Sequence, residues 1–412
     1  MVSEFKPSDS LQDVRYEIRG NLAHRAHELE RQGYEIVSLN IGNPGLFGFR
    51  TPESMRLAMI ENMASSEAYC HQNGIFPARE AVVMQQQDRG VPDVTADHVF
   101  IGNGVSELID MTLRALLDTG DEVLIPSPDY PLWTAGVTLN GGKALHYPCP
   151  PENNFEPDLA ALEKLITKKT RAIVVINPNN PTGAVYSRDT LTAIAALAEK
   201  HRLVVLSDEI YERMTYDNAE FIPMATLVSK SLCGTFSGLS KVYRACGYRV
   251  GWVVFSGDCE HAEEYLHGLE LLASLRLCSN VPGQWGVQTA LGGYQSILEF
   301  VAPGGRLYTS RKAVMDAVDA SPYLSLVAPA GSMYAFVGVN QQRLPAFDDH
   351  QFALDLLEAR HVLVAPGSSF NVPYNNYFRI TILPDADTLT DVFTRIHDVL
   401  EGYANGTKLE AI

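Results

Sequence analysis

Ser237-Gly238-Leu239-Ser240-Lys241 places a lysine eight residues before the arginine of Gly247-Tyr248-Arg249-Val250-Gly251. Two motifs precede this pair: Asn177-Pro178-Asn179-Asn180-Pro181-Thr182-Gly183 and Asp208-Glu209-Ile210-Tyr211. Together they supply one lysine, one acid that follows an apolar run, and several groups suited to an anion. Each motif alone is a weak signal, but the four in this order are specific enough to predict both fold and chemistry.

Short continuous apolar runs alternate with helical segments along the middle of the chain. Residues 99–101, 122–125, 172–176 and 203–206 form such runs, and a helical segment at 187–200 separates two of them. Strands that are apolar throughout are typical of a sheet buried on both faces, so we predict an α/β fold with a mostly parallel sheet covered by helices. Functional residues are then expected at the C-terminal ends of the strands, where the motifs lie.

The chain divides into three predicted parts. A length of 412 residues is too great for one simple core, so we expect two domains that pack together. Residues 46–293 form the predicted large domain, and residues 294–412 form a smaller α+β domain. Residues 1–45 are expected to provide an N-terminal arm and part of the small domain. Within 294–412 we predict helices near 305–320, 350–360 and 387–403. A turn that leads into a strand is expected at 327–336, and a second strand at 361–365.

Composition and charge narrow the range of partners. Apolar residues make up 46% and charged residues 20%, which is ordinary for a soluble globular protein. The formal net charge of −17 opposes binding to nucleic acid and to anionic membranes. The same charge repels anionic substrates, so a site for phosphate or carboxylate must be locally basic. A few well-placed arginines are therefore informative in this sequence.

Cysteines and the N-terminus predict a cytoplasmic protein. None of the six cysteines forms a C-x-x-C pair, which favours free thiols in a reducing compartment. Residues 1–6 contain no apolar core of a signal peptide, and no apolar stretch approaches the roughly 20 residues of a membrane span.

The order and spacing of the motifs, from about residue 40 to residue 379, resemble the class I and II aminotransferases of fold type I. The resemblance implies pyridoxal 5′-phosphate as cofactor and no metal. It also implies that Lys241 bonds to the aldehyde of the cofactor and later moves a proton. The alternative for Lys241 is a surface lysine that follows a loop.

Four residues are assigned to the cofactor ring. Asp208 follows a buried strand, where a carboxylate needs a partner, and the ring nitrogen supplies one; the alternative is a helix cap. Glu209 is the less favoured acid because it lies one residue off register. The resemblance implies that Tyr211 and Asn180 hydrogen-bond the ring hydroxyl and that Tyr130 stacks on the ring. The alternatives are a structural turn for Asn180 and core packing for Tyr130. Trp133 is expected to be a core residue.

The phosphate is assigned to a helix start and an arginine. Gly104-Val105-Ser106 opens a helix, whose bare N–H groups and positive end suit an anion. With Arg249 this segment resembles the phosphate site of the family. Relatives often carry a serine three residues before the lysine, whereas this sequence has Gly238. Ser240 or Ser237 is therefore expected to supply the hydroxyl.

One cofactor contact is expected to come from a second subunit. Tyr69 resembles the tyrosine that reaches the phosphate of the partner subunit, which implies a homodimer with shared active sites.

Substrate contacts are assigned at both ends of the chain. The resemblance places Arg379 on the substrate α-carboxylate, which its planar guanidinium can bind with two hydrogen bonds; the alternative is a surface salt bridge. Gly42 and Asn180 are expected beside it. Tyr16 and Arg19 lie on the predicted N-terminal arm, and Arg19 is the candidate for the distal carboxylate of glutamate. The alternative for Arg19 is a solvated residue.

Within the family, the chain resembles the bacterial alanine-synthesising glutamate–pyruvate transaminases. The resemblance rests on segments such as 16–20, 39–44, 101–108, 128–133 and 289–296. It implies ping-pong transfer of an amino group, with glutamate and pyruvate giving 2-oxoglutarate and alanine. Aromatic or branched-chain aminotransferases and carbon–sulfur lyases of the same fold remain alternatives. A transcription regulator is disfavoured because the chain lacks a basic DNA-binding segment.

Overall fold

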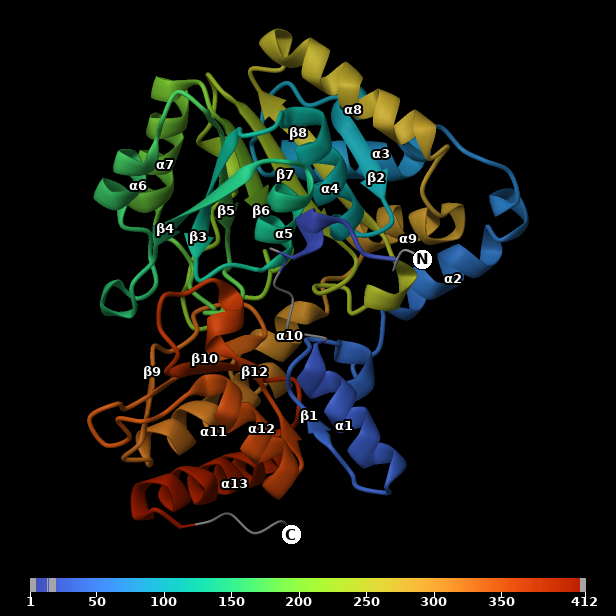
Figure 1. Cartoon of the computed structure of the whole chain (residues 1–412). Coiled ribbons are helices and arrows are strands. Elements are labelled where there is room, and N and C mark those ends of the chain that lie inside the picture. Colours follow the sequence, from blue (N-terminus) through green and yellow to red (C-terminus); the bar gives the residue numbers. More distant parts are fainter. Residues whose placement is uncertain (1–4, 13, 15–19, 408–412) are drawn as a thin grey trace.

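The computed structural model describes residues 5–12, 14 and 20–407, which form two packed bodies (Figure 1). The large-sheet body, in the upper half of the view, is built on a seven-stranded sheet. The small-sheet body, below it, combines a four-stranded sheet with the first helix and the last part of the chain. The domain limits expected at residues 45 and 293 remain a prediction.

The large sheet is mostly parallel, as predicted. Its strands run in the order β2–β8–β7–β6–β5–β3–β4, and β8 alone among these described strands is antiparallel to its neighbours. The strands are β2 (Val99–Gly102), β3 (Glu122–Ser127), β4 (Lys143–Pro148), β5 (Thr170–Ile176), β6 (Val204–Asp208), β7 (Leu232–Gly238) and β8 (Gly251–Gly257).

Helices cover both faces of this sheet, which explains the continuous apolar runs. Val174 and Leu206 point to one face and pack in the same cluster as residues of α4 and α8, whereas Val175 and Val205 point to the other. The first face carries α4 (Val105–Leu116), α5 (Leu132–Leu139) and α8 (Glu263–Leu275). The remaining helices of this body are α2 (Glu53–Glu61), α3 (Phe76–Asp88), α6 (Leu159–Leu165), α7 (Arg188–His201) and α9 (Val281–Gly292). The short helix α10 (Ile297–Val301) lies at the junction of the two bodies and contacts α11 (Arg306–Asp319) (Figure 1).

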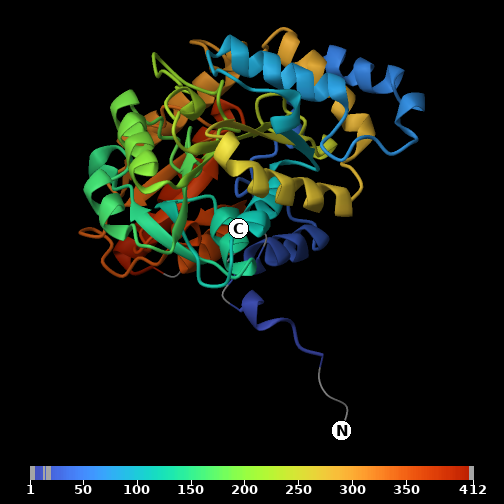
Figure 2. The ribbon, with the colours of Figure 1, turned by 90° about the horizontal axis from the view of Figure 1, so that it is seen from above.

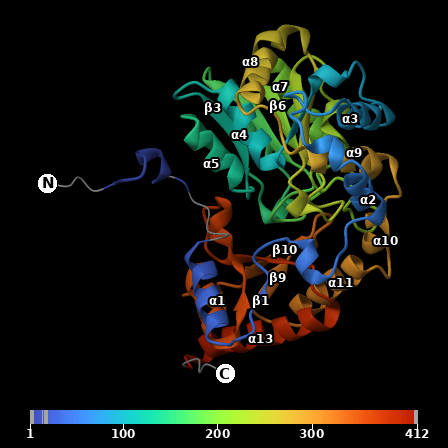
Figure 3. The same ribbon diagram turned by 90° about the vertical axis from the view of Figure 1, so that its right-hand side faces the viewer.

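The small-sheet body joins the two ends of the chain (Figure 3). Its antiparallel sheet has the order β12–β13–β10–β9 and packs with three long helices. These elements are β9 (Leu324–Leu326), β10 (Tyr334–Val339), β12 (Ala365–Pro366), β13 (Tyr377–Thr381), α11 (Arg306–Asp319), α12 (Asp349–Arg360) and α13 (Ala386–Asn405). Near the N-terminus, β1 (Val37–Ser38) pairs in parallel with β11 (Val362–Leu363), and α1 (Asn21–Arg31) contacts α12.

Local sequence sets the ends of these helices. Gly33 adopts a φ of 99° just beyond α1, as expected for a glycine at the C′ position. Asp348 and Asp385 accept hydrogen bonds from the first turns of α12 and α13. The strand predicted at 361–365 is instead two short strands, β11 and β12, that pair with different partners.

The N-terminal segment leaves the body beside α5 (Figure 2). It contains the short 3-10 helix Asp9–Leu11. The six cysteines are free, as predicted. Among the residues that the structure describes, none of the helices combines the length and the apolar character that a membrane span requires.

Candidate active site

A pocket of about 160 Å³ lies between the two bodies, at the C-terminal edge of the large sheet. Strands β5, β6 and β7 end at this edge, since they run in the same direction. Eleven of the predicted residues line it: Gly42, Val105, Ser106, Tyr130, Asn180, Asp208, Tyr211, Ser240, Lys241, Arg249 and Arg379. Residues more than 330 positions apart therefore meet in one pocket.

Lys241 follows the end of β7 and extends into the pocket. Its amine donates a hydrogen bond of 2.6 Å to the carbonyl oxygen of Gly42, which belongs to the small-sheet body. The side chain is only partly exposed and lines the pocket. The alternative of a surface lysine is therefore wrong.

Asp208 is the last residue of β6 and is 3% exposed. The indole N–H of Trp133 donates to Oδ2 at 3.1 Å, and the backbone N–H of Ile210 donates to Oδ1 at 3.3 Å. Burial raises the pKa of Asp208 to about 6, although these two donors and the charge of Lys241 oppose the rise. A turn rather than a helix follows in the described structure, so the helix-cap alternative is wrong.

Glu209, one residue later, faces away from the pocket. Its Oε1 accepts hydrogen bonds from Ser207 Oγ at 2.9 Å and from the backbone N–H of Met224 at 3.0 Å. Arg89 lies 3.9 Å from its other oxygen. Burial raises the pKa of Glu209 to about 7, against the charge of Arg89. As the sequence predicted, Asp208 and not Glu209 is the acid of the pocket.

The asparagine-rich loop after β5 serves both structure and site. The side chains of Asn177 and Asn179 accept hydrogen bonds within the loop, from the backbone of Tyr186 and Thr182 at 3.0 and 3.1 Å. Asn180 instead accepts a 3.0 Å hydrogen bond from Arg379 Nη1 and lines the pocket.

The start of α4 and Arg249 form the basic end of the pocket. Gly104 is the N-cap of α4 with a φ of 86°, and the Arg249 guanidinium donates to the carbonyl of Asn103 at 3.2 Å. A Cβ atom on Gly104 would lie 2.4 Å from Nη2 of Arg249, so only glycine allows this approach. Gly104 itself does not line the pocket, but it brings the arginine to the helix start.

The absence of a serine at Gly238 has a steric reason. A Cβ atom there would lie 2.8 Å from the carbonyl oxygen of Val250 and 2.9 Å from the Cα of Gly251, both in the adjacent β8 segment. Ser240 lines the pocket, whereas Ser237 is buried within β7. Of the two serines predicted as replacements, Ser240 is the one at the pocket.

Arg379 is buried, at 1% exposure, in the middle of β13. Its guanidinium lies between the rings of Tyr334 and Phe370, at 4.2 and 4.7 Å from their centroids. It also donates to the backbone carbonyl of Asn40, and its Nε has no hydrogen-bond partner among the described residues. The alternative of a surface salt bridge is wrong, and the guanidinium retains a donor for an incoming anion.

Besides Gly104, one described candidate does not line the pocket, and two further candidates cannot be placed relative to it. Tyr69 is 78% exposed and does not line it, so its predicted contact requires a second subunit and stays a prediction. Tyr16 and Arg19 lie outside the described residues.

The pocket also contains residues that sequence reasoning missed. The additional lining residues are Tyr334, Cys246, Ile41, Ile176 and Ile210. Trp133 lies behind the pocket and donates a hydrogen bond to Asp208. The position of Cys246 between Lys241 and Arg249 was a usable signal, because that loop carries two predicted site residues. Tyr334 is harder to find, since it reaches the site through the pairing of β10 with β13.

Comparisons with known proteins agree with this geometry. The profile of the family described as aminotransferase class I and II matches residues 34–396. The glutamate-pyruvate aminotransferase of Escherichia coli is 46% identical over 402 residues, which are 98% of this chain and 99% of that protein. An alanine aminotransferase of Mycobacterium bovis is 47% identical over 400 residues, 97% of this chain and 93% of the relative. A crystal structure of an aminotransferase from Escherichia coli gives a TM-score of 0.96 at 46% identity and covers 98% of this chain and 100% of its own.

Proposed function

The chain belongs to the aminotransferase class I and II family, and we propose that it transfers an amino group between glutamate and pyruvate with pyridoxal 5′-phosphate as cofactor. The observation that carries the proposal is the position of the Lys241 amine, in one pocket with Asp208 and Arg379. The high identity to a glutamate-pyruvate aminotransferase and to an alanine aminotransferase supports the choice of substrates.

The charges of the pocket fit this cofactor. Asp208 is a buried acid whose hydrogen-bond donors, Trp133 and Ile210, are both neutral. Its carboxylate therefore suits a protonated ring nitrogen. At the basic end, Arg249 and the first N–H groups of α4 suit a phosphate. When bound, the cofactor draws electrons from the amino acid Cα and carries the amino group between the two half-reactions.

Each residue of the pocket then has a distinct task. Asp208 holds the proton on the ring nitrogen, while Asn180 and Tyr211 hold the ring oxygen and Tyr130 stacks on the ring. Ser240 adds a hydroxyl at the phosphate. The amine of Lys241 would move the proton at the substrate Cα.

Arg379 would bind the α-carboxylate that every amino acid and 2-oxo acid substrate carries. Its unpartnered Nε and its aromatic neighbours suit a planar anion. Gly42 places its backbone beside this carboxylate. For the distal carboxylate of glutamate we retain Arg19, with Tyr16, as the candidates.

We propose further that the enzyme is a cytoplasmic homodimer. Tyr69 and Leu275 are 78% and 75% exposed. Their segments are joined by a 2.8 Å hydrogen bond between Gln72 and Glu270. Large exposed apolar side chains in one region favour a protein interface. A second subunit on this surface would bring Tyr69 to the phosphate of its neighbour. The net charge and the free cysteines support the cytoplasmic location.

Lys241→Ala tests the core of the proposal. We expect this variant to fold and to lose transamination, while borohydride treatment of the wild-type holoenzyme fixes the cofactor on Lys241. Peptide mass spectrometry locates the label, and a label on another lysine would refute the assignment.

A donor–acceptor panel on the holoenzyme tests the substrates. Glutamate with pyruvate should be the preferred pair over aromatic and branched-chain donors, without release of ammonia. Preference for an aromatic or branched-chain donor, or release of ammonia from a sulfur amino acid, would replace the proposed specificity with one of the alternatives.

A further inference from the structure

Tyr334 has the position of an active-site residue but none of the roles assigned above. It opens β10, is 3% exposed, and pairs with Thr381, two residues from Arg379. The Arg379 guanidinium lies 4.2 Å from the centroid of its ring, and Phe370 covers the guanidinium at 4.7 Å. The ring of Tyr334 therefore fixes the arginine that would bind the substrate carboxylate.

The hydroxyl of Tyr334 lies against the backbone that holds the lysine. A Cβ atom on Gly42 would be 2.3 Å from this hydroxyl oxygen, so the contact depends on glycine. The Lys241 amine donates to the carbonyl oxygen of the same Gly42 at 2.6 Å. The Lys241 amine and the Tyr334 hydroxyl thus both lie against Gly42 of the small-sheet body.

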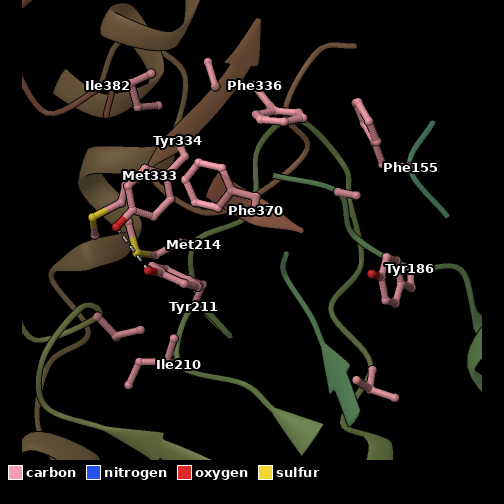
Figure 4. Packing of buried hydrophobic residues seen from close by; sticks show 14 of the residues in the cluster. Phe155, Tyr186, Ile210, Tyr211, Met214, Met333, Tyr334, Phe336, Phe370 and Ile382 are labelled. Atoms are coloured by element: carbon pink, nitrogen blue, oxygen red, sulfur yellow. Dashed lines mark hydrogen bonds between the residues drawn. The ribbon is translucent and has the colours of Figure 1, made fainter. Parts of the chain in front are cut away.

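Tyr211 approaches the same phenol from the large-sheet body. Its hydroxyl lies 3.5 Å from that of Tyr334, and Figure 4 shows the two hydroxyl ends directed toward one another. Tyr211 and Gly42 therefore lie at the hydroxyl of Tyr334, and Arg379 lies over its ring.

The two phenols differ in their electrostatic surroundings. Burial raises the pKa of Tyr211 well above its usual value, and the neighbouring Tyr334 adds to the rise. Burial opposes ionisation of Tyr334 as well, but the positive charges of Lys241 and Arg379 and the hydrogen bond from Tyr211 outweigh it and lower its pKa. Tyr334 is thus the acceptor of the pair and Tyr211 the donor.

We propose that Tyr334 is a positioning residue of the active site, whose hydroxyl supports Gly42, the acceptor of the Lys241 amine, and whose ring holds Arg379. This inference rests on the proposed function, because it assigns Tyr334 to the lysine and the arginine of that reaction. The side chain of Tyr334 would thus support both Lys241, which moves the proton, and Arg379, which binds the carboxylate. Removal of the hydroxyl alone should therefore slow the reaction without weakening the binding of the carboxylate.

Two substitutions separate the two parts of the side chain. Tyr334→Phe removes the hydroxyl and keeps the ring, whereas Tyr334→Leu removes both. Tyr147→Phe is the matched control, because Tyr147 is also fully buried and its hydroxyl donates to a backbone carbonyl, that of Val174, at 2.7 Å outside the pocket.

Three measurements on the full-length protein distinguish the variants. For the holoenzyme, kcat and KM are measured with alanine, and the Kd of propanoate is measured by calorimetry as a probe of Arg379. In protein from which the cofactor has been removed, the rate of reductive methylation of Lys241 is followed by peptide mass spectrometry.

We expect Tyr334→Phe to lower kcat at least ~10-fold and to speed methylation of Lys241 by about 3-fold, because Gly42, whose carbonyl accepts from the amine, loses the support of the hydroxyl. The Kd of propanoate should stay within about 2-fold, because the ring still supports Arg379. In Tyr334→Leu the Kd should also rise, by about 5-fold. Tyr147→Phe should change none of the three quantities.

The inference fails if Tyr334→Phe keeps the wild-type kcat and methylation rate, or if it weakens propanoate binding as much as Tyr334→Leu does. It also fails if Tyr147→Phe reproduces the changes, since a purely structural loss would then explain them. Failure of the proposed function is separate, because it would show as activity that survives Lys241→Ala.

Discussion

Asp208 and Glu209 are adjacent buried acids at the end of β6, and they belong to two different regions. Asp208 opens to the pocket, where neutral N–H groups of Trp133 and Ile210 donate to it. Glu209 belongs to a charged cluster on the opposite side, with Arg89 and Glu212. A buried acid that has a cationic partner within the chain is already balanced, whereas one held by neutral donors suits a cation that arrives with a ligand.

The charged cluster behind the pocket fixes the segment that carries the site. Arg89 bonds Glu212 and approaches Glu209, and Gln85 donates to Glu212 at 3.2 Å. Burial lowers the pKa of Arg89, but the two glutamates outweigh it and raise the value overall. Residues 208–212 are thus held from behind by charge, while Asp208 and Tyr211 face the pocket. Substitutions on either side of this segment test the contrast.

Arg89→Leu should destabilise the fold more than any of the other substitutions. It would leave Glu209 and Glu212 buried together without their cation, and breaking a buried pair in this way costs about 3–5 kcal/mol. The free energy of unfolding from urea titration at pH 7 measures the effect. The loss should shrink at pH 5, where the acids can take up protons. An equal loss at both pH values would show that lost packing, and not charge, is responsible.

Asp208→Asn should lower kcat on the order of 100-fold or more, about 2.7 kcal/mol, because the neutral amide no longer holds the proton on the ring nitrogen. Its stability should stay close to that of the wild type. Glu209→Gln is the matched control and should keep kcat within about 3-fold, because Glu209 faces away from the pocket. If the two variants lost activity equally, the assignment of the two sides would be wrong.

The stability of cofactor-free protein should fall as pH rises from about 4.5 to 7. Glu209 titrates near 7 in the folded chain, above its usual 4.5, so the folded state binds more protons than the unfolded state in this window. Glu209→Gln should reduce the fall by on the order of 1–3 kcal/mol. The free energy of unfolding, measured by denaturation at pH 5 and pH 7.5, gives the size of this fall. Glu163→Gln, an exposed acid paired with Lys200, should leave the fall unchanged.

Trp133→Phe should have the smallest effect, a decrease of kcat by about 3- to 10-fold. The phenyl ring keeps much of the packing but removes one donor to Asp208, and a hydrogen bond to a charged group contributes about 1.5 kcal/mol. A pH profile of kcat checks the cause, because the loss of a donor should raise the pKa of Asp208 further. An unchanged profile would leave Trp133 with a packing role alone.

Sequence predicted most of the pocket because its residues lie in local motifs at strand ends. Lys241, Asp208 and Asn180 each follow a buried strand, and parallel strands bring such ends to one edge. The same reasoning could not find Trp133, since an apolar run gave no hint that its N–H points to Asp208. It also could not find Tyr334, because its contacts in the site come from separate segments, among them Tyr211, which is 123 positions away.

Local patterns in the chain were enough to predict the alternation of strands and helices, the family, and the motif residues, because periodicity and short motifs involve neighbouring residues only. The tertiary structure decides to which side of the sheet each of two adjacent side chains points. Asp208 and Glu209 are adjacent acids in the sequence, and in the fold they separate because successive side chains of a strand point to opposite faces. Folding also settled that Gly238 excludes serine, since the obstructing atoms belong to Val250 and Gly251. Close packing between distant segments sets these contacts, and no local pattern records it.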